Sequence, residues 1–527
     1  MNEVTRWFDH KLYRWMDESE FTSMAEALRN RCTEEYVREL LAEYSNLSNI
    51  HITYYKAGTY EEKDKCRLDN VPDFYEIRMD QRVAKNHVGS MRIYLPVQWN
   101  HRFLGITGAG TNTEVDWYTS VRYNVLSWPM AIKNGFACVA ADNDTGIHLD
   151  CSWGFDSNGK LEWDHINAWA YTTVHEMTLA AKKVVEAVYG EKILASYMHG
   201  TSGGARQAVT EAVTYGKDYD GVWADSPAVD HVRLPFSCLW AIVVESNEKH
   251  IVSLAKYKKA YEVATQDPVL LKLPFNPHQI PWMDYIRKIH GIETEDGPIT
   301  DRDLQVMIKT WDGPISRAGH RMGYGFGPTI RQWPLETGNP LYGYFQRDEQ
   351  GRYKPMPIAL QAMRWMTEDP NFDIYKCTYE QFEWIYSHNR FPFIKYTFDS
   401  SRFGSFTKRG GKAIITEGTG DPVLPWPLLT DYYFDIINHY PKERTANESI
   451  RMFMMPRAGH SILDWSGPAV TTADGMKSLM NWVEKGIAPE KLRAVKYDFD
   501  ADAAVEEIEI ESYNRFKEYQ WKRSLSL

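Results

Sequence analysis

A serine, an aspartate and a histidine follow one another along this chain, each directly after an apolar run. The segment GTSGG (200–204) has the pattern GxSxG, Asp421 lies in the turn GTGDP, and His460 lies in PRAGHS. A serine hydroxyl becomes a strong nucleophile only when a histidine takes its proton and an acid orients that histidine. The three residues therefore predict acyl transfer, with Ser202 as nucleophile, His460 as base and Asp421 as acid.

The setting of Ser202 strengthens this interpretation, because GxSxG alone is a weak signal. ILASYM (193–198) is typical of a buried strand, and 205–214 is typical of a helix. A tight turn between strand and helix raises a serine above the sheet. Glycines at both ends of the motif avoid collisions of a Cβ atom with the neighbouring strand and helix. The helix N-terminus also favours developing negative charge.

The negative charge that develops on the substrate oxygen requires two backbone N–H donors. One is expected from Gly203, the residue after the nucleophile, and the other from the loop Gly108-Ala109-Gly110 after an early strand. We predict Gly203, Ala109 and Gly110 as the oxyanion hole. An ordinary glycine-rich turn is the alternative for 108–110.

Other residues compete for the acid and base roles. Asp225 follows the apolar run GVWA and is the rival acid, and Asp421 itself could simply start a turn before a proline. The remaining downstream histidines lack the setting of a loop after a strand; they are His231, His250, His278, His290, His320, His388 and His439.

Two further motifs suggest metal chemistry only superficially. His175-Glu176 begins HEMTL, but Leu179 stands where a zinc HExxH motif needs its second histidine. DNDTG (142–146) carries two carboxylates after a strand, and we interpret it as a structured turn near the mouth of the site. The sequence therefore predicts no metal and no cofactor.

The elements that must position these residues alternate between strand and helix. Apolar runs at 136–142 and 221–224 flank a long amphipathic helix at about 169–188, and the same rhythm resumes at 411–456. This alternation predicts a mainly parallel α/β sheet. Between about 231 and 395 the pattern breaks into irregular turns rich in proline and aromatic residues, which indicates an insertion packed over the sheet.

Composition narrows the class of partner. The 527 residues carry a net charge of −11, which argues against nucleic acid or an anionic membrane, and the 14% of aromatic residues suits an aromatic small molecule. The first residues contain no apolar signal segment, and the six cysteines form no CxxC pair. We expect a cytoplasmic enzyme with free thiols; the oligomeric state is not predicted.

The sequence resembles the tannase and feruloyl esterase family of α/β-hydrolases. The resemblance implies hydrolysis of gallate or hydroxycinnamate esters through an acyl-enzyme, with a lid domain inserted in the hydrolase core. It places the catalytic roles on Ser202, Asp421 and His460. The similar blocks are RFLGITGAG (102–110), GFACVAADNDTG (135–146), VHEMTLAAKKVVEAVYG (174–190), YMHGTSGGARQAVTEAV (197–213), YDGVWADSPAV (219–229), WDGPISRAGHRMGYGFGP (311–328), GGKAIITEGTGDPVLP (410–425) and FMMPRAGH (453–460).

The chain departs from the family at the catalytic loops. Members typically carry cysteines before the serine and after the histidine, which form a disulfide; here Thr201 and Ser461 occupy these positions. The geometry must then be held by packing and hydrogen bonds, as suits a reducing compartment. A calcium loop of the kind found in many members is not recognisable around 280–300.

These inferences combine into one predicted organisation: a helical N-terminal flank (1–50), an α/β-hydrolase catalytic domain split over 51–230 and 396–485, an inserted lid domain (231–395) and a C-terminal tail (486–527) whose role is not readable. The expected substrate is an aromatic ester bound by lid residues that the sequence does not identify. Another serine hydrolase, an acyltransferase or a lyase with the same triad, or a non-catalytic binding protein on the same fold, remain as alternatives.

Overall fold

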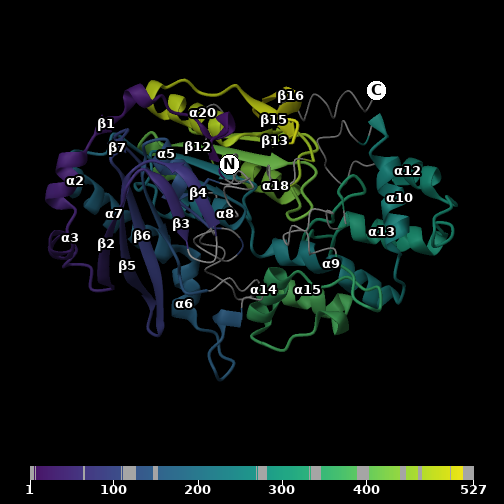
Figure 1. Ribbon diagram of the computed structural model, residues 1–527. Coiled ribbons are helices and arrows are strands. Elements are labelled where there is room, and N and C mark those ends of the chain that lie inside the picture. Colours follow the sequence, from purple (N-terminus) through teal and green to yellow (C-terminus); the bar gives the residue numbers. More distant parts are fainter. Residues whose placement is uncertain are drawn as a thin grey trace.

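A nine-stranded sheet forms the centre of the molecule in the computed structural model (Figure 1). The strand order is β13-β12-β11-β10-β8-β9-β6-β5-β2. The described residues are 5, 8–62, 66–108, 110, 126–145, 152–268, 270, 282–331, 333, 346–388, 403–439, 447–460, 466–498 and 500–513. The strands are β2 (Leu47–Tyr55), β5 (Phe74–Ala84), β6 (His87–Pro96), β8 (Arg102–Ile106), β9 (Ala137–Ala141), β10 (Ala195–Thr201), β11 (Gly221–Asp225), β12 (Lys412–Gly418) and β13 (Ile450–Met455).

Strand direction divides this sheet into two parts. From β9 to β13 all neighbours are parallel, whereas β9 pairs with β6, β6 with β5 and β5 with β2 in the antiparallel sense. Every residue of β9, β10 and β11 is buried, as expected for strands covered on both faces. Because β10 to β13 are parallel neighbours, the loops that carry Ser202, Asp421 and His460 leave the same edge of the sheet.

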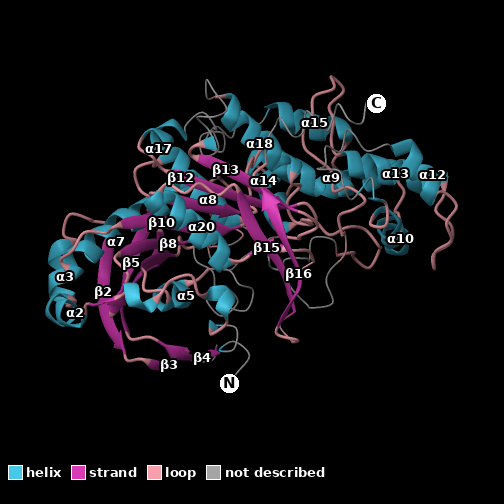
Figure 2. Cartoon of the chain, turned by 90° about the horizontal axis from the view of Figure 1, so that it is seen from above, coloured by secondary structure: helices cyan, strands magenta, loops and turns pink. Residues whose placement is uncertain are grey.

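Helices cover both faces of the sheet, which is seen from above in Figure 2. Val139 of β9 belongs to the hydrophobic cluster that includes α7 and α8, whereas the next residue, Ala140, belongs to the cluster that includes α5 and α20. The alternation of side chains along each strand thus separates two cores. The first face carries α2 (Ala25–Arg31), α3 (Glu34–Leu40), α7 (Thr173–Tyr189), α8 (Gly203–Thr214), α17 (Gly404–Lys408) and α18 (Pro427–Asn438), and the second carries α5 (Trp128–Lys133) and α20 (Thr472–Lys485).

Most of the described residues between 233 and 388 are helical and gather on the side of the molecule away from α2 and α3 (Figure 1). They form a hydrophobic cluster of their own, which also takes in Val423, Leu424 and Trp426 from the turn after Asp421. The inserted segment is therefore packed directly against the acid loop. Its elements are α9 (Arg233–Glu248), α10 (Leu254–Ala264), α12 (Trp282–Ile289), α13 (Asp301–Asp312), α14 (Pro357–Thr367), η7 (Ile374–Lys376) and α15 (Tyr379–His388).

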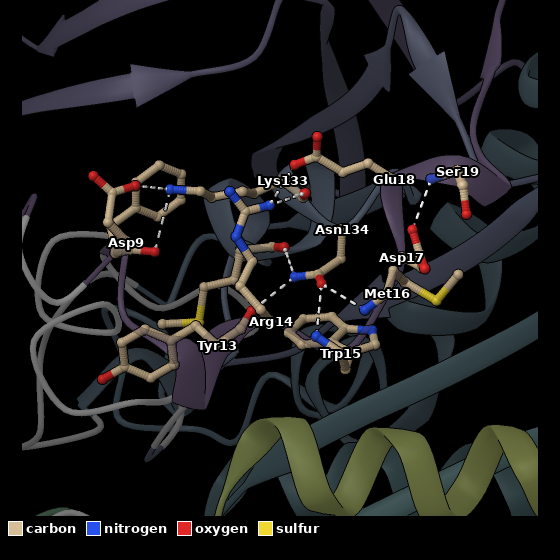
Figure 3. A network of polar contacts seen from close by, with 12 residues as sticks. Asp9, Tyr13, Arg14, Trp15, Met16, Asp17, Glu18, Ser19, Lys133 and Asn134 are labelled. Carbon is tan, nitrogen blue, oxygen red and sulfur yellow. Dashed lines mark hydrogen bonds and ion pairs between the residues drawn. The ribbon is translucent and has the colours of Figure 1, made fainter.

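The N-terminal segment is anchored to the core by one buried asparagine, Asn134, at the end of α5 (Figure 3). Its Oδ1 accepts from the backbone N–H groups of Trp15 (2.9 Å) and Met16 (3.1 Å), and its Nδ2 donates to the carbonyls of Tyr13 and Met130, both at 2.9 Å. The segment contains η1 (Lys11–Tyr13), η2 (Glu18–Glu20) and β1 (Thr22–Ser23), which pairs with β7 (Gln98–Trp99). The predicted helical flank contains α2 and α3, and the main sheet already begins within it, at Leu47.

The expected C-terminal tail starts with ordered structure. β15 (Lys491–Asp498) and β16 (Ala503–Glu511) form an antiparallel hairpin beside β14 (Ala469–Val470). Leu492, Val495 and Ile510 belong to the core that covers α20, so this hairpin is part of the hydrolase core rather than an appendage. A small two-stranded sheet, β3 (Gly58–Glu62) with β4 (Cys66–Val71), completes the strands of the described chain. None of the helices described is both long and apolar enough to cross a membrane.

Candidate active site

Ser202 occupies a strained turn between β10 and α8. Its φ of 61° and ψ of −123° lie outside the regions that non-glycine residues normally adopt. A backbone N–H bond to the carbonyl of Asp225 (3.0 Å) holds the turn against the next strand. This is the geometry that lifts a nucleophile above the end of a parallel sheet.

The glycines of the motif are required by close backbone packing. A Cβ on Gly200 would lie 2.0 Å from Thr107 Oγ1 and 2.4 Å from the carbonyl carbon of Gly204. A Cβ on Gly204 would lie 2.2 Å from the carbonyl oxygen of Gly108. Specific neighbours, which include the loop after β8, therefore leave no room for a side chain at these two glycines, as the sequence predicted.

His460 and Asp421 form a fully buried pair. His460 Nδ1 lies 2.6 Å from Asp421 Oδ2, and both side chains are 0% exposed. The other carboxylate oxygen, Oδ1, accepts from the backbone N–H groups of Val423 (2.6 Å) and Leu424 (3.0 Å). Asp421 is thus fixed at one oxygen by its own turn and aims the second at the imidazole, as an orienting acid must.

The loops that carry these two residues are packed backbone to backbone. Gly420 N donates to the carbonyl of Ala458 (2.9 Å), and Thr419 N donates to that of Met455 (3.0 Å). A Cβ on Gly418 would lie 2.1 Å from the carbonyl oxygen of Gly459. The distance between acid and base is therefore set by main-chain contacts and does not depend on long side chains.

Asp225, the rival acid, has other contacts. Its Oδ1 accepts from Thr416 Oγ1 at 2.6 Å, and its Oδ2 accepts from Thr201 Oγ1 at 3.4 Å. The carboxylate consequently links β10, β11 and β12 just below the catalytic edge. The close partner of the His460 imidazole is Asp421.

Glu417 is a site residue that sequence reasoning missed. It lies at the end of β12, is 1% exposed, and accepts from the N–H of Gly418 (3.0 Å). Burial, followed by the carboxylates of Asp421 and Asp225, raises the pKa of Glu417 well above its usual range. It is therefore held as the neutral acid beside Asp421. The only sequence signal was an acidic residue at the end of an apolar strand.

The two parts of the predicted oxyanion hole are adjacent. A Cβ on Gly203 would lie 2.1 Å from the carbonyl oxygen of Gly110, so the two backbones touch at this point. Two residues that the sequence did not single out position the loop: Gln207 Oε1 accepts from Gly108 N (3.3 Å), and Thr107 Oγ1 donates to the carbonyl of His199 (3.0 Å). Ala109 lies outside the described residues.

A buried arginine connects α8, the helix after Ser202, with aromatic side chains that contact the inserted segment. Arg206 of α8 donates to the carbonyls of Ala170 (2.9 Å) and Trp169 (3.2 Å), and its guanidinium packs over the Trp169 ring at 4.2 Å. Burial lowers the pKa of Arg206 to about 9. Both carbonyls belong to a π-helical turn, Ala168–Thr172, and Trp169 also contacts Trp365 of α14. Within the predicted lid, residues 269, 271–281, 332, 334–345 and 389–395 lie outside the described residues.

The fold is that of an α/β-hydrolase. It is defined by the strand order of the sheet, the strained turn that carries Ser202 and the buried His460–Asp421 pair. The chain belongs to a particular family of this class: the model of the "Tannase and feruloyl esterase" family matches residues 79–267 and 291–526. The resemblance inferred from the sequence is therefore confirmed.

Individual relatives support the assignment. The chain is 26% identical over 448 residues to a probable feruloyl esterase of Arthroderma benhamiae, covering 79% of this chain and 78% of the relative. It is 26% identical to an uncharacterized esterase of Xanthomonas campestris, covering 85% and 81%. Among solved structures, tannin acyl hydrolase from Aspergillus niger has a TM-score of 0.74 at 17% identity, with 92% of each chain covered. Feruloyl esterase B from Aspergillus oryzae has a TM-score of 0.71 at 18% identity, covering 90% and 96%.

Proposed function

We propose that this protein is a serine esterase that hydrolyses esters of hydroxycinnamic or gallic acid through an acyl-enzyme. The observation that carries the proposal is the fully buried His460–Asp421 pair, 2.6 Å apart, at the edge of the sheet where the turn with Ser202 also lies. Membership of the tannase and feruloyl esterase family supports the substrate class.

In the proposed reaction His460 removes the Ser202 proton as the hydroxyl oxygen attacks the ester carbonyl. The N–H of Gly203 and the loop that contains Gly110 stabilise the oxyanion. His460 then protonates the leaving alcohol, and in the second half it activates water to release the acid. Asp421 holds the imidazole in one tautomer and stabilises its charged form, which forms where both side chains are 0% exposed.

Hydrolysis of a panel of esters tests the proposal. The purified protein is incubated with methyl ferulate, methyl gallate, chlorogenate, an alkyl ester without an aromatic acid, and a peptide amide. We expect turnover of at least one of the three aromatic esters, little turnover of the alkyl ester, and none of the amide. Activity on none of the aromatic esters would refute the proposed substrate class.

Two matched variants test the residues. Ser202→Ala and His460→Ala are each expected to abolish ester turnover, because the nucleophile and its base act as a unit. His51→Ala removes an exposed histidine on β2, outside the catalytic loops and the inserted segment, and it should leave turnover unchanged. Full activity in Ser202→Ala would contradict the mechanism.

We further propose that the enzyme works in the cytoplasm or another reducing compartment. Cys32 and Cys377 are buried free thiols, and Cys238 is a partly buried free thiol. Thr201, at a position where family members typically carry a cysteine, donates to Asp225 instead. Alkylation of freshly prepared, denatured protein should find all six cysteines as thiols; an oxidised pair would contradict the proposal.

A further inference from the structure

A second group of reactive side chains lies where the turn between β5 and β6 meets α6 (Trp163–Asn167). His87 Nε2 lies 2.8 Å from Glu162 Oε2, and the His87 ring stacks on that of His165 with centroids 3.7 Å apart. One ligand atom from each of His87, Glu162 and His165 lies within 4.8 Å of the other two. Two imidazoles and a carboxylate are ligands that a transition metal prefers.

The buried histidine of this group, His165, offers an uncommitted nitrogen. Its side chain is 0% exposed, and its Nε2 lies 2.7 Å from the carbonyl oxygen of Asn143. Because a carbonyl can only accept, the proton is on Nε2 and Nδ1 keeps its lone pair. Nδ1 is buried and has no hydrogen-bond partner among the described residues. Buried polar atoms are satisfied by a protein group, a water molecule or an ion, so this nitrogen is open to a ligand.

His87 carries the same arrangement with a carboxylate. Its Nδ1 lies 2.9 Å from Asp144 Oδ2, and its Nε2 lies 2.8 Å from Glu162 Oε2, so a bound metal ion would replace the proton that Nε2 now shares with Glu162. Metal-bound histidines commonly donate their second N–H to a carboxylate or a backbone carbonyl, which fixes the ring and raises the basicity of the ligating nitrogen. Here both supporting acceptors, Asn143 and Asp144, come from DNDTG, the motif that the catalytic site leaves without a role.

From this geometry we infer a metal site for Zn²⁺ or a similar borderline divalent ion, with His87 Nε2, Glu162 and His165 Nδ1 as protein ligands and water in the remaining position. A surface hollow of about 280 Å³ beside the cluster gives access to it; it is lined by residues 84–87 and 161–165. Nitrogen ligands argue against Ca²⁺ or Mg²⁺, which prefer oxygen alone.

Binding requires one local adjustment. The planes of the stacked rings are inclined by only 20°, so their in-plane lone pairs run almost side by side. His87 is the ligand that must turn toward the common centre. It is 21% exposed and lies at the start of β6, whereas the fully buried His165 is fixed by Asn143. The bound ion would then tie the β5–β6 turn to α6.

The other histidine and carboxylate cluster of the described chain is less suitable. His175, Glu211 and Asp218 also bring ligand atoms within 4.8 Å of one another. However, Lys182 Nζ contacts the Asp218 carbonyl and lies 3.0 Å from Ser196 Oγ, so an ammonium group already lies beside these acids. The repulsion between this ammonium and a metal ion disfavours a second positive ion there.

The test is a titration of the full-length protein, freed of metal with a chelator, with Zn²⁺ by calorimetry and with Co²⁺ by visible absorption. We expect one high-affinity ion per chain and a Co²⁺ spectrum of low coordination number. His87→Ala and the nearly isosteric Glu162→Gln should weaken binding by at least about tenfold. Lys85→Ala alters the same hollow without removing a ligand, and should bind as tightly as wild type or more tightly because a like charge is removed.

The outcomes separate this site from its alternatives. Circular dichroism of each apo variant checks folding, and Glu162→Gln keeps the test valid if His87→Ala does not fold. No saturable binding by the wild-type protein would overturn the inference, as would equal affinity in wild type and both ligand variants. Loss of the ion in His175→Ala with unchanged binding in Glu162→Gln would place the metal at the other cluster and equally reject the site. Ester turnover is not a readout, so failure here leaves the proposed esterase function untouched.

Discussion

Replacing Asp421 with asparagine isolates the electrostatic role of the acid, because the side chain keeps its size. The carbonyl oxygen of an asparagine can still accept from Val423 and Leu424, as Oδ1 does now. The amide NH₂ then faces His460 Nδ1 at the position of the 2.6 Å contact. A donor there favours the tautomer with its proton on Nε2, which cannot take the serine proton.

The burial of the pair sets the size of the effect. Both side chains are 0% exposed, so water cannot replace the lost counter-ion when His460 becomes charged. Breaking a buried ion pair costs about 3–5 kcal/mol. Because about 1.4 kcal/mol corresponds to a factor of ten, kcat should fall roughly 10²- to 10⁴-fold. KM should change little, since Asp421 is too deeply buried to contact the substrate in the ground state.

Asp225→Asn is the matched control, because it makes the same chemical change one strand away. Its amide oxygen can still accept from Thr416, and the contact to Thr201 is long at 3.4 Å. A loss of about 1 kcal/mol, typical of one hydrogen bond, predicts a decrease in kcat of less than about tenfold. The assay is steady-state hydrolysis of the best aromatic ester, with thermal unfolding of both variants to check the fold. A larger loss in Asp225→Asn than in Asp421→Asn would refute the assignment of the acid.

Three further predictions follow from the same structure. Glu417 is protonated in the native state and ionised in the unfolded state above a pH of about 4.3. The native state therefore binds one more proton, and the free energy of unfolding falls as pH rises above this value, by up to about 1.4 kcal/mol per pH unit. Glu417→Gln should remove this slope, and equal slopes for wild type and variant in denaturant unfolding from pH 5 to 7 would contradict the neutral acid. Asn134→Ala leaves several buried backbone groups unpaired and should lower the free energy of unfolding by at least about 3 kcal/mol, at about 1–3 kcal/mol per group. Asn371→Ala, at an exposed asparagine, should change it by less than about 0.5 kcal/mol. Comparable chemical denaturation midpoints for the two variants would argue against the anchor. Gly200→Ala forces a Cβ to within 2.4 Å of the Gly204 backbone and should prevent correct folding or abolish turnover, while Gly327→Ala, with nothing within 4 Å, should be silent in both assays.

Local sequence patterns were sufficient to predict the parallel half of the sheet. The apolar runs at 136–142, 221–224 and 411–418 became β9, β11 and β12, with boundaries that moved by at most one residue. Such strands are buried on both faces, so their continuous hydrophobicity is visible without knowledge of their neighbours. The predicted helix at 169–188 begins later, at Thr173, because Ala168–Thr172 is π-helical and Arg206 binds its carbonyls.

The patterns were insufficient where a partner distant in sequence determines the structure. Residues 503–511 alternate acidic and apolar residues weakly, and their strand is defined by pairing with 491–498. Across this hairpin Arg493 pairs with Glu507 and Lys491 with Glu509, so charges in a tail whose role could not be read from the sequence have partners on the neighbouring strand. The neutral state of Glu417 is likewise set by acids on other segments and is not encoded locally.

The chain lacks the cysteines that could join the serine and histidine loops, and the structure supplies another route between them. Ser202 N bonds to the carbonyl of Asp225, whose carboxylate accepts from Thr416 of β12. β12 leads into the acid loop, and Gly420 of this loop bonds to Ala458 of the histidine loop. Each step joins neighbouring parallel strands or their loops, so the placement of the three catalytic loops follows from sheet register and does not depend on thiol oxidation. A hydrolase built in this way can keep its active site in a reducing environment, where a disulfide clamp would open.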